Sequence, residues 1–260
     1  MAEAADPDVL AAMREHGFAV LPGVLQTAQI DRALTALDAA AQASDRRGIP
    51  TRLETLDPGG CNIRVYDLIE HDPVFAELAS HPWVIAHVDE LLDHDLMISN
   101  FSANTALPGS RSMNAHCDQS TVMPEPWLEQ YTMNAIWCLH DVDEANGATR
   151  YLPGSHRITG WAQVPDDPKA GMASFRASAG SVILMDGRLW HTSGENRTAS
   201  RRRSLLFAFY SRSFLRLQNN WFQALSASTQ AALSPQLRHW LGLSGGNMKY
   251  GTYLASAPDD

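Results

Sequence analysis

The sequence has few of the residues on which several classes of protein depend. Its 260 residues include three cysteines and no CxxC pair, so neither a disulfide framework nor a thiolate zinc cage is expected. Only two residues are lysine, and 20 basic residues against 29 acidic ones give a formal net charge of -9. Such a chain is a poor general binder of nucleic acid or of anionic membranes. No apolar run reaches the roughly 18 residues of a membrane-spanning helix.

The N-terminal ten residues also lack the features of a secretory signal. They are acidic and rich in alanine, with no basic segment leading into an apolar one. Together with the few cysteines, this predicts a cytoplasmic protein. A hydrophobic content of 45% over 260 residues is enough for one substantial core. We therefore expect a single domain over residues 1–260.

The hydrophobic pattern predicts three successive regions. Helical spacing dominates a flank of about residues 1–93, which also contains extended segments at 17–23 and 61–69. Short β-type runs with turn signals between them fill a core of about residues 94–213, and helical character returns in a tail of about 214–260. The fold class is therefore mainly β with flanking helices, an antiparallel sandwich or barrel.

Three residues of this β core have the composition of a metal site. His116 and Asp118 are two positions apart, so in an extended segment they project to the same face. His191 ends a second β-like run 75 residues after His116. Two histidines and one carboxylate from separate strands form the facial triad of non-haem Fe(II) enzymes, which leaves metal positions open. The alternative is that these are surface-loop and strand-end residues without a shared role.

An arginine cluster follows the second histidine. Arg202 and Ser204 would share one face of the next strand, where a guanidinium and a hydroxyl suit a carboxylate ligand. Arg201 and Arg203 would then point toward solvent. The alternative is a solvated basic turn.

Beyond these residues, several longer segments resemble one known family, the phytanoyl-CoA dioxygenase family of Fe(II)/2-oxoglutarate-dependent oxygenases. The resemblance covers roughly residues 10–215 and implies a double-stranded β-helix, the cupin-like jelly roll. The segments that carry it are EHGFAVLPGVL (15–25), NIRVYDLI (62–69), HCD (116–118), NGATRYLPGSHR (146–157) and AGSVILMDGRLWHTSGENRTASRRRS (179–204).

The resemblance also implies cofactors and residue roles. It implies Fe(II) held by His116, Asp118 and His191 as the catalytic centre, with 2-oxoglutarate and O2 as co-substrates. Arg202 resembles the arginine that holds the distal carboxylate of 2-oxoglutarate, and Met113 stands where some members have a glutamine that contacts it. Further positions that match co-substrate contacts are Thr149, Ser193, Arg64 and, beside Arg202, Ser204.

The implied reaction is oxidation, most simply hydroxylation, of a small organic molecule with release of succinate and CO2. We expect a natural-product intermediate as substrate. We also expect some of residues 119–130 to line the substrate mouth, because this segment follows the H-x-D pair. Two other functions stay open: a cupin-like metalloenzyme independent of 2-oxoglutarate, and a ligand-binding barrel without catalysis. The substrate's identity and the oligomeric state cannot be predicted from the sequence.

Overall fold

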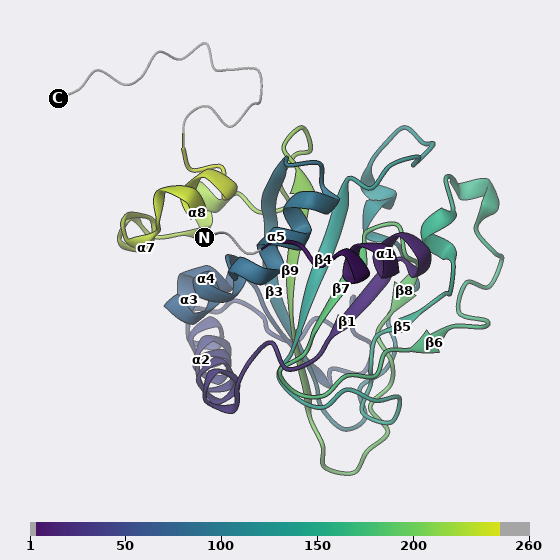
Figure 1. The fold of residues 1–260 in the computed structure, drawn as a ribbon. Helices are drawn as coiled ribbons and strands as arrows, with labels where there is room; N and C mark the ends of the chain where they lie inside the picture. Colours follow the sequence, from purple (N-terminus) through teal and green to yellow (C-terminus); the bar gives the residue numbers. More distant parts are fainter. Residues whose placement is uncertain (1–3, 245–260) are drawn as a thin grey trace.

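Two antiparallel sheets form the centre of the molecule (Figure 1). The structure is a computed structural model that describes residues 4–244. The larger sheet has six strands in the order β1-β7-β4-β9-β3-β2, and the smaller has three in the order β6-β5-β8. The strands are β1 Phe18–Leu21, β2 Asn62–Val65, β3 Leu96–Ala106, β4 Thr132–Cys138, β5 Arg150–Tyr151, β6 Ala173–Ser174, β7 Val182–Asp186, β8 His191–Thr192 and β9 Arg203–Arg212.

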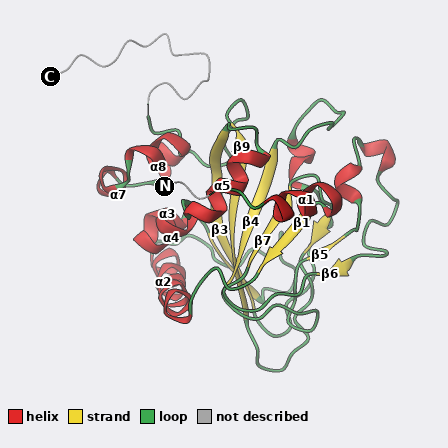
Figure 2. Ribbon diagram, viewed as in Figure 1, coloured by secondary structure: helices red, strands yellow, loops and turns green. Residues whose placement is uncertain are grey.

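Helices cover the outer face of the larger sheet (Figure 2). Proline at the first turn helps to start four of them, because proline has no N–H to leave unpaired there. The helices are α1 Pro7–His16, α2 Thr27–Arg46, α3 Leu68–His71, α4 Pro73–Ala79, α5 Pro82–Leu91, α6 Trp221–Ala224, α7 Ala227–Ala232 and α8 Pro235–Trp240. No helix within residues 4–244 combines the length and apolarity needed to cross a membrane.

The inner strands β4, β7 and β9 of the larger sheet are buried on both faces. In β9, Leu206 and Ala208 pack in the core under the helices. Leu205, whose side chain points to the opposite face, packs in a second cluster that includes Phe175, next to β6 of the smaller sheet. A strand covered on both faces reads as apolar at every position, so its sequence does not show which side chains face inward.

The predicted fold class is confirmed, since the sheets and flanking helices form the expected mainly β architecture. The region boundaries need one correction. The N-terminal flank supplies β1 and β2, which are the two edge strands of the larger sheet, so the sheet is not confined to residues 94–213. Of the predicted helical tail, residues 214–244 contain three short helices, and residues 245–260 lie outside the described part of the chain.

Candidate active site

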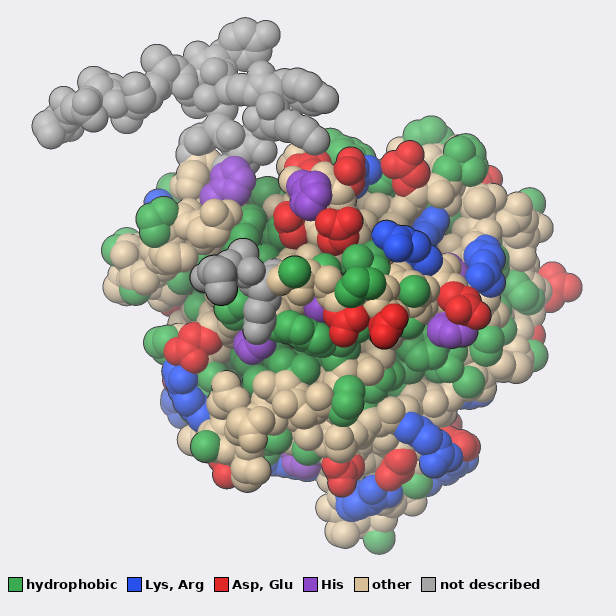
Figure 3. Space-filling view, in the orientation of Figure 1, with side chains coloured by type: hydrophobic (Ala, Val, Ile, Leu, Met, Phe, Trp, Pro, Cys, Tyr) green, Lys and Arg blue, Asp and Glu red, His purple; other side chains and the backbone are tan. Residues whose placement is uncertain are grey.

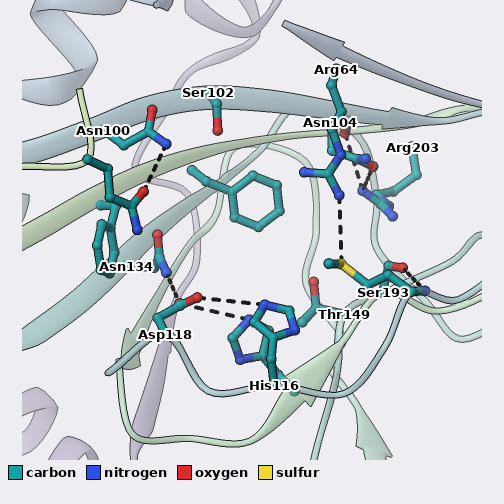
Figure 4. A pocket seen from close by; sticks show the side chains of 15 residues that line it. Arg64, Asn100, Ser102, Asn104, His116, Asp118, Asn134, Thr149, Ser193 and Arg203 are labelled. Atoms are coloured by element: carbon teal, nitrogen blue, oxygen red, sulfur yellow. Dashed lines mark hydrogen bonds and ion pairs between the residues drawn. The ribbon is translucent and has the colours of Figure 1, made fainter. Parts of the chain in front are cut away.

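The two histidines and the aspartate of the predicted triad converge on one point (Figure 4). Their ligand atoms all lie within 4.8 Å of one another. His116 Nε2 is 3.7 Å from Asp118 Oδ1, and His191 Nε2 is 3.9 Å from Asp118 Oδ2. This is the only such group of three or more metal-ligating side chains within residues 4–244. The structure therefore assembles the set of ligands that the sequence suggested.

A direct backbone pairing brings the two histidines together. The N–H of His116 donates to the carbonyl of His191 at 3.0 Å, and the N–H of His191 donates to the carbonyl of His116 at 2.8 Å. Residues paired in this way on antiparallel segments project to the same side. The imidazole centroids are accordingly 4.3 Å apart. Asp118 begins a short 3-10 helix, Asp118–Thr121, immediately after the bridge.

Hydrogen bonds to backbone carbonyls fix the tautomer of both rings. His116 Nδ1 lies 3.0 Å from the carbonyl of Asn114, and His191 Nδ1 lies 2.9 Å from the carbonyl of Leu189. Because a carbonyl oxygen only accepts, each Nδ1 carries the proton and each Nε2 presents a free lone pair. Burial lowers the pKa of His191, which also favours the neutral ring. Both rings are thus prepared as metal ligands.

Asn134 of β4 orients the carboxylate. Its Nδ2 donates to Asp118 Oδ2 at 2.6 Å, and the side chain is buried. Hydrogen bonds of this kind fix a ligand's orientation, and losing one typically costs about 10- to 100-fold in metal affinity. We expect Asn134→Leu to weaken Fe(II) binding by about this factor. Competition with a chelating dye would measure it.

Asn146 offers a matched control for that change, because it is a buried asparagine that lies outside the triad. Its Nδ2 donates to the carbonyl of Asp141 at 2.6 Å within a turn. Asn146→Leu should lower the melting temperature without a specific loss of metal affinity. Equal metal affinities for folded Asn134→Leu and the parent protein would contradict the orienting role.

One cavity extends from the triad between the sheets. Its enclosed volume is about 150 Å³. In Figure 4 His116 and Asp118 lie on one side of it, and Arg64, Asn104 and Arg203 lie on another. One cavity therefore connects the metal site with the two arginines.

Arg203 presents an unbalanced positive charge to this cavity. Its side chain is buried, Nη2 donates to the carbonyl of Gly147 at 2.7 Å, and Nη1 lies 3.2 Å from Asn104 Oδ1. No carboxylate pairs with it among residues 4–244, and its Nε has no hydrogen-bond partner there. Burial lowers the pKa of Arg203 to about 10, so the group is still charged at neutral pH. A buried charge is costly without a partner, which makes this end of the cavity a site for an anion.

The structure corrects the prediction for Arg202 and Ser204. Arg202 directly precedes β9 and Ser204 lies within it, and neither side chain lines the cavity. Arg202 is partly exposed and pairs with Asp38 of α2 at 3.0 and 3.1 Å. Ser204 is buried and hydrogen-bonds to Thr105 Oγ1 at 2.8 Å. Arg203, which was expected to face solvent, is the inward one, so the predicted orientation of the three arginines was wrong.

The other predicted co-substrate residues all line the cavity. They are Thr149, Ser193 and Arg64, and Met113 lies with them. Ser193 Oγ accepts from the N–H of Met113 at 3.0 Å. Arg64 pairs with the buried carboxylate of Asp57, so its charge is already balanced, unlike that of Arg203. Their contacts with 2-oxoglutarate stay a prediction.

Residues 119–130 do not line the cavity, contrary to expectation. Gln119 ties the segment back on itself, because its Oε1 accepts from the N–H of Tyr131 and its Nε2 donates to the carbonyl of Glu129. Trp127 is buried in a separate cluster with Cys117 and Trp190. Other parts of the chain line the cavity instead of residues 119–130. The lining side chains that the sequence analysis did not identify include Asn100, Ser102, Asn104, Phe207, Phe209 and Gln218.

Comparison with known sequences decides the family. Residues 13–204 match the profile of the phytanoyl-CoA dioxygenase (PhyH) family. The chain belongs to the phytanoyl-CoA dioxygenase family. A dioxygenase of Aspergillus fumigatus, af480, is 44% identical over 237 residues, which cover 91% of this chain and 77% of the relative.

Solved structures share the fold of this PhyH-family chain. The carbocyclase SnoK from nogalamycin biosynthesis superposes with a TM-score of 0.67 at 20% identity, covering 86% of this chain and 92% of SnoK. HygX from Streptomyces hygroscopicus, with nickel and 2-oxoglutarate bound, superposes with a TM-score of 0.65 at 20% identity. The match covers 82% of this chain and 90% of HygX. At these identities the likeness concerns the jelly-roll fold.

As a PhyH-family member, the chain is an Fe(II)/2-oxoglutarate-dependent oxygenase. Its own residues fit both groups. Two imidazoles and one carboxylate form the donor set that suits Fe(II) with open coordination positions. The unpaired Arg203 at the far end of the cavity provides the positive charge that a dicarboxylate requires.

Proposed function

We propose that this PhyH-family enzyme hydroxylates a carbon–hydrogen bond of a small natural-product intermediate. For each substrate oxidised, one 2-oxoglutarate and one O2 would be consumed, and one succinate and one CO2 released. One oxygen atom enters the substrate alcohol and the other enters succinate. The observation that supports this most directly is the cavity that joins the metal triad to the unpaired Arg203.

Different residues of the cavity would hold Fe(II) and 2-oxoglutarate. His116, Asp118 and His191 would hold Fe(II), which supplies the O2-activating redox chemistry when bound. Arg203 would bind the distal carboxylate of 2-oxoglutarate and so set the direction of the molecule in the cavity.

Hydroxyl groups and aromatic rings complete the site. Thr149 and Ser193 lie in the lining, where their hydroxyls can donate to carboxylate oxygens. Phe207 also lines the cavity, and its ring limits the water that reaches the reacting atoms. SnoK, which shares this fold, comes from nogalamycin biosynthesis, and a natural-product substrate for this chain agrees with that source.

The test is an anaerobic titration of apoprotein with Fe(II) and 2-oxoglutarate, followed in the visible spectrum. We expect a charge-transfer band that saturates at one equivalent of each, and succinate formation once air is admitted. Succinate is expected even without substrate, at a lower rate. A folded protein that binds Fe(II) but gives neither band nor succinate would contradict the proposal and favour a metal enzyme independent of 2-oxoglutarate.

A further inference from the structure

The part of the cavity away from Arg203 differs sharply in charge from the part beside it. Apart from the metal ligand Asp118, its lining side chains within the described residues are neutral. Both cationic residues of the lining, Arg64 and Arg203, lie together on the other side (Figure 4). We call this neutral part the substrate end and define it by Asn100, Ser102, Asn134, Phe207, Phe209 and Gln218.

A β-bulge turns the polar side chains of β3 into the substrate end. The pairing of β3 with β9 shifts register between Ile98 and Asn100. Before the shift, Leu96 and Ile98 pack under the helices, and after it Phe101 and Ala103 do so. Without the bulge, alternation would place Asn100 on the helix side with Ile98. With it, Asn100 and the residues at 102 and 104 face the cavity.

The same bulge anchors the segment that follows β9. Ser99 Oγ accepts from the N–H of Gln218 at 2.9 Å, and the carbonyl of Ser99 accepts from the N–H of Asn219 at 2.9 Å. Trp221 Nε1 donates to the carbonyl of Ile98 at 2.7 Å. Three hydrogen bonds thus hold residues 218–221 against β3 and place Gln218 beside Asn100.

The two carboxamides form a pair in which Asn100 Oδ1 and Gln218 Nε2 take no part. Asn100 Nδ2 donates to Gln218 Oε1 at 3.1 Å. Asn100 Oδ1 is shielded from solvent and has no hydrogen-bond partner among residues 4–244. Leaving such an acceptor unpaired is costly, and a ligand hydroxyl that reached it would remove the cost. Gln218 is exposed, so rotation of its side chain at the mouth can admit such a group.

Apolar surface lies next to this amide pair. Phe207 and Phe209 project from β9 on the same face as Arg203 and line the cavity. Their rings can pack against a carbon skeleton but offer nothing to a charged group. A substrate with phosphate, carboxylate or ammonium groups would have to leave them unpaired here, which is unfavourable away from water.

We infer that the substrate end recognises an uncharged, oxygenated carbon skeleton, with the Asn100–Gln218 pair binding one of its hydroxyl groups. This rests on the proposed function and narrows its substrate class. The hydroxyl would donate to Asn100 Oδ1 and accept from Gln218 Nε2, while Phe207 and Phe209 contact the skeleton. A free amino acid, which would bring its ammonium and carboxylate groups into the substrate end, does not match this lining.

The test compares three probes that share one skeleton: menthol, menthylamine and p-menthane-3-carboxylate. Binding is measured by ligand-observed NMR on protein loaded with Zn(II), in place of Fe(II), and 2-oxoglutarate. We expect menthol to bind at least tenfold more tightly than the amine or the carboxylate. Tighter or equal binding of either charged probe, or no binding of menthol, would overturn the inference.

Variants then assign the preference to the amide pair. Asn100→Leu and Gln218→Met should each weaken menthol binding at least fivefold, while Gln223→Met, an exposed glutamine outside the cavity lining, should leave it unchanged. Unchanged menthol binding in both cavity variants would overturn the assignment. The Fe(II)/2-oxoglutarate band of the parent protein is recorded separately. Its absence would refute the proposed function, whereas its presence without a menthol preference would refute only the substrate class.

Discussion

Replacing Arg203 with methionine is expected to raise the 2-oxoglutarate concentration needed for half-maximal succinate formation by on the order of 100-fold or more. Removing one partner of a buried, hydrogen-bonded charge pair costs about 2–5 kcal/mol, and about 1.4 kcal/mol corresponds to a factor of ten. Arg203 is buried, and no acid among the described residues pairs with it, so the co-substrate's carboxylate is the partner it would lose. Initial rates at varied 2-oxoglutarate give the measurement.

Arg202→Met is the matched control, since it changes the adjacent residue in the same way. Arg202 is partly exposed and bonded to Asp38, and surface ion pairs contribute only about 0–1 kcal/mol. We therefore expect its 2-oxoglutarate requirement to stay within about twofold of the parent value. The opposite result, a large effect at Arg202 and none at Arg203, would show that β9 presents the other face to the cavity.

Thermal melts separate loss of binding from loss of folding in the Arg203 variant. The substitution removes the desolvation cost of the buried charge, which offsets the loss of its hydrogen bonds to Gly147 and Asn104. The Zn(II)-loaded variant without co-substrate should therefore melt within a few degrees of the parent. Adding 2-oxoglutarate should raise the melting temperature of the parent, because a ligand that binds only the folded state stabilises it. The variant should show no such rise.

His191→Ala is expected to abolish turnover and the Fe(II)/2-oxoglutarate charge-transfer band. The substitution removes one of three protein ligands, and His191 is the buried member of the two histidines. With two ligands left, the site cannot hold the metal in the facial arrangement that oxygen chemistry requires. The measurements are the anaerobic visible spectrum and succinate release, which we expect to fall by at least about 1,000-fold given the catalysis the metal provides.

His94→Ala provides the comparison for that change. Its ring is 66% exposed and pairs with Asp89 on the protein surface. We expect full band intensity and turnover from this variant. A band of normal intensity in folded His191→Ala would contradict the assignment of the triad.

The metal triad could be predicted because residue type and spacing alone indicate it. An H-x-D pair and a distant histidine at the ends of β-like runs are informative whichever face of the strand is buried. The register of β9 could not be predicted in this way. Both faces of that strand are buried, so Leu205 and Leu206 give no contrast, and three consecutive arginines offered every choice of register. Only the pairing of β9 with β3, Arg203 opposite Ala106, decides which arginine is inside.

The residues that line the substrate end could not be predicted for a different reason. Polar residues at alternate positions, Asn100, Ser102 and Asn104, lie within an otherwise buried strand, and this signal is visible in the sequence. What the sequence hides is the bulge beside Ser99, which decides the face to which they turn. Proximity in sequence to the H-x-D pair favoured residues 119–130, but the hydrogen bonds of Gln119 turn that segment away.

The backbone bridge between His116 and His191 also bears on how the protein folds. The two paired residues are 75 positions apart, so their contact closes a long loop and carries a large entropic cost. Neither the first histidine with its aspartate nor the second alone forms the centre. The metal site is therefore complete only when this long-range pairing has formed. Iron bound by these residues would link two distant parts of the chain and stabilise the folded jelly roll against opening.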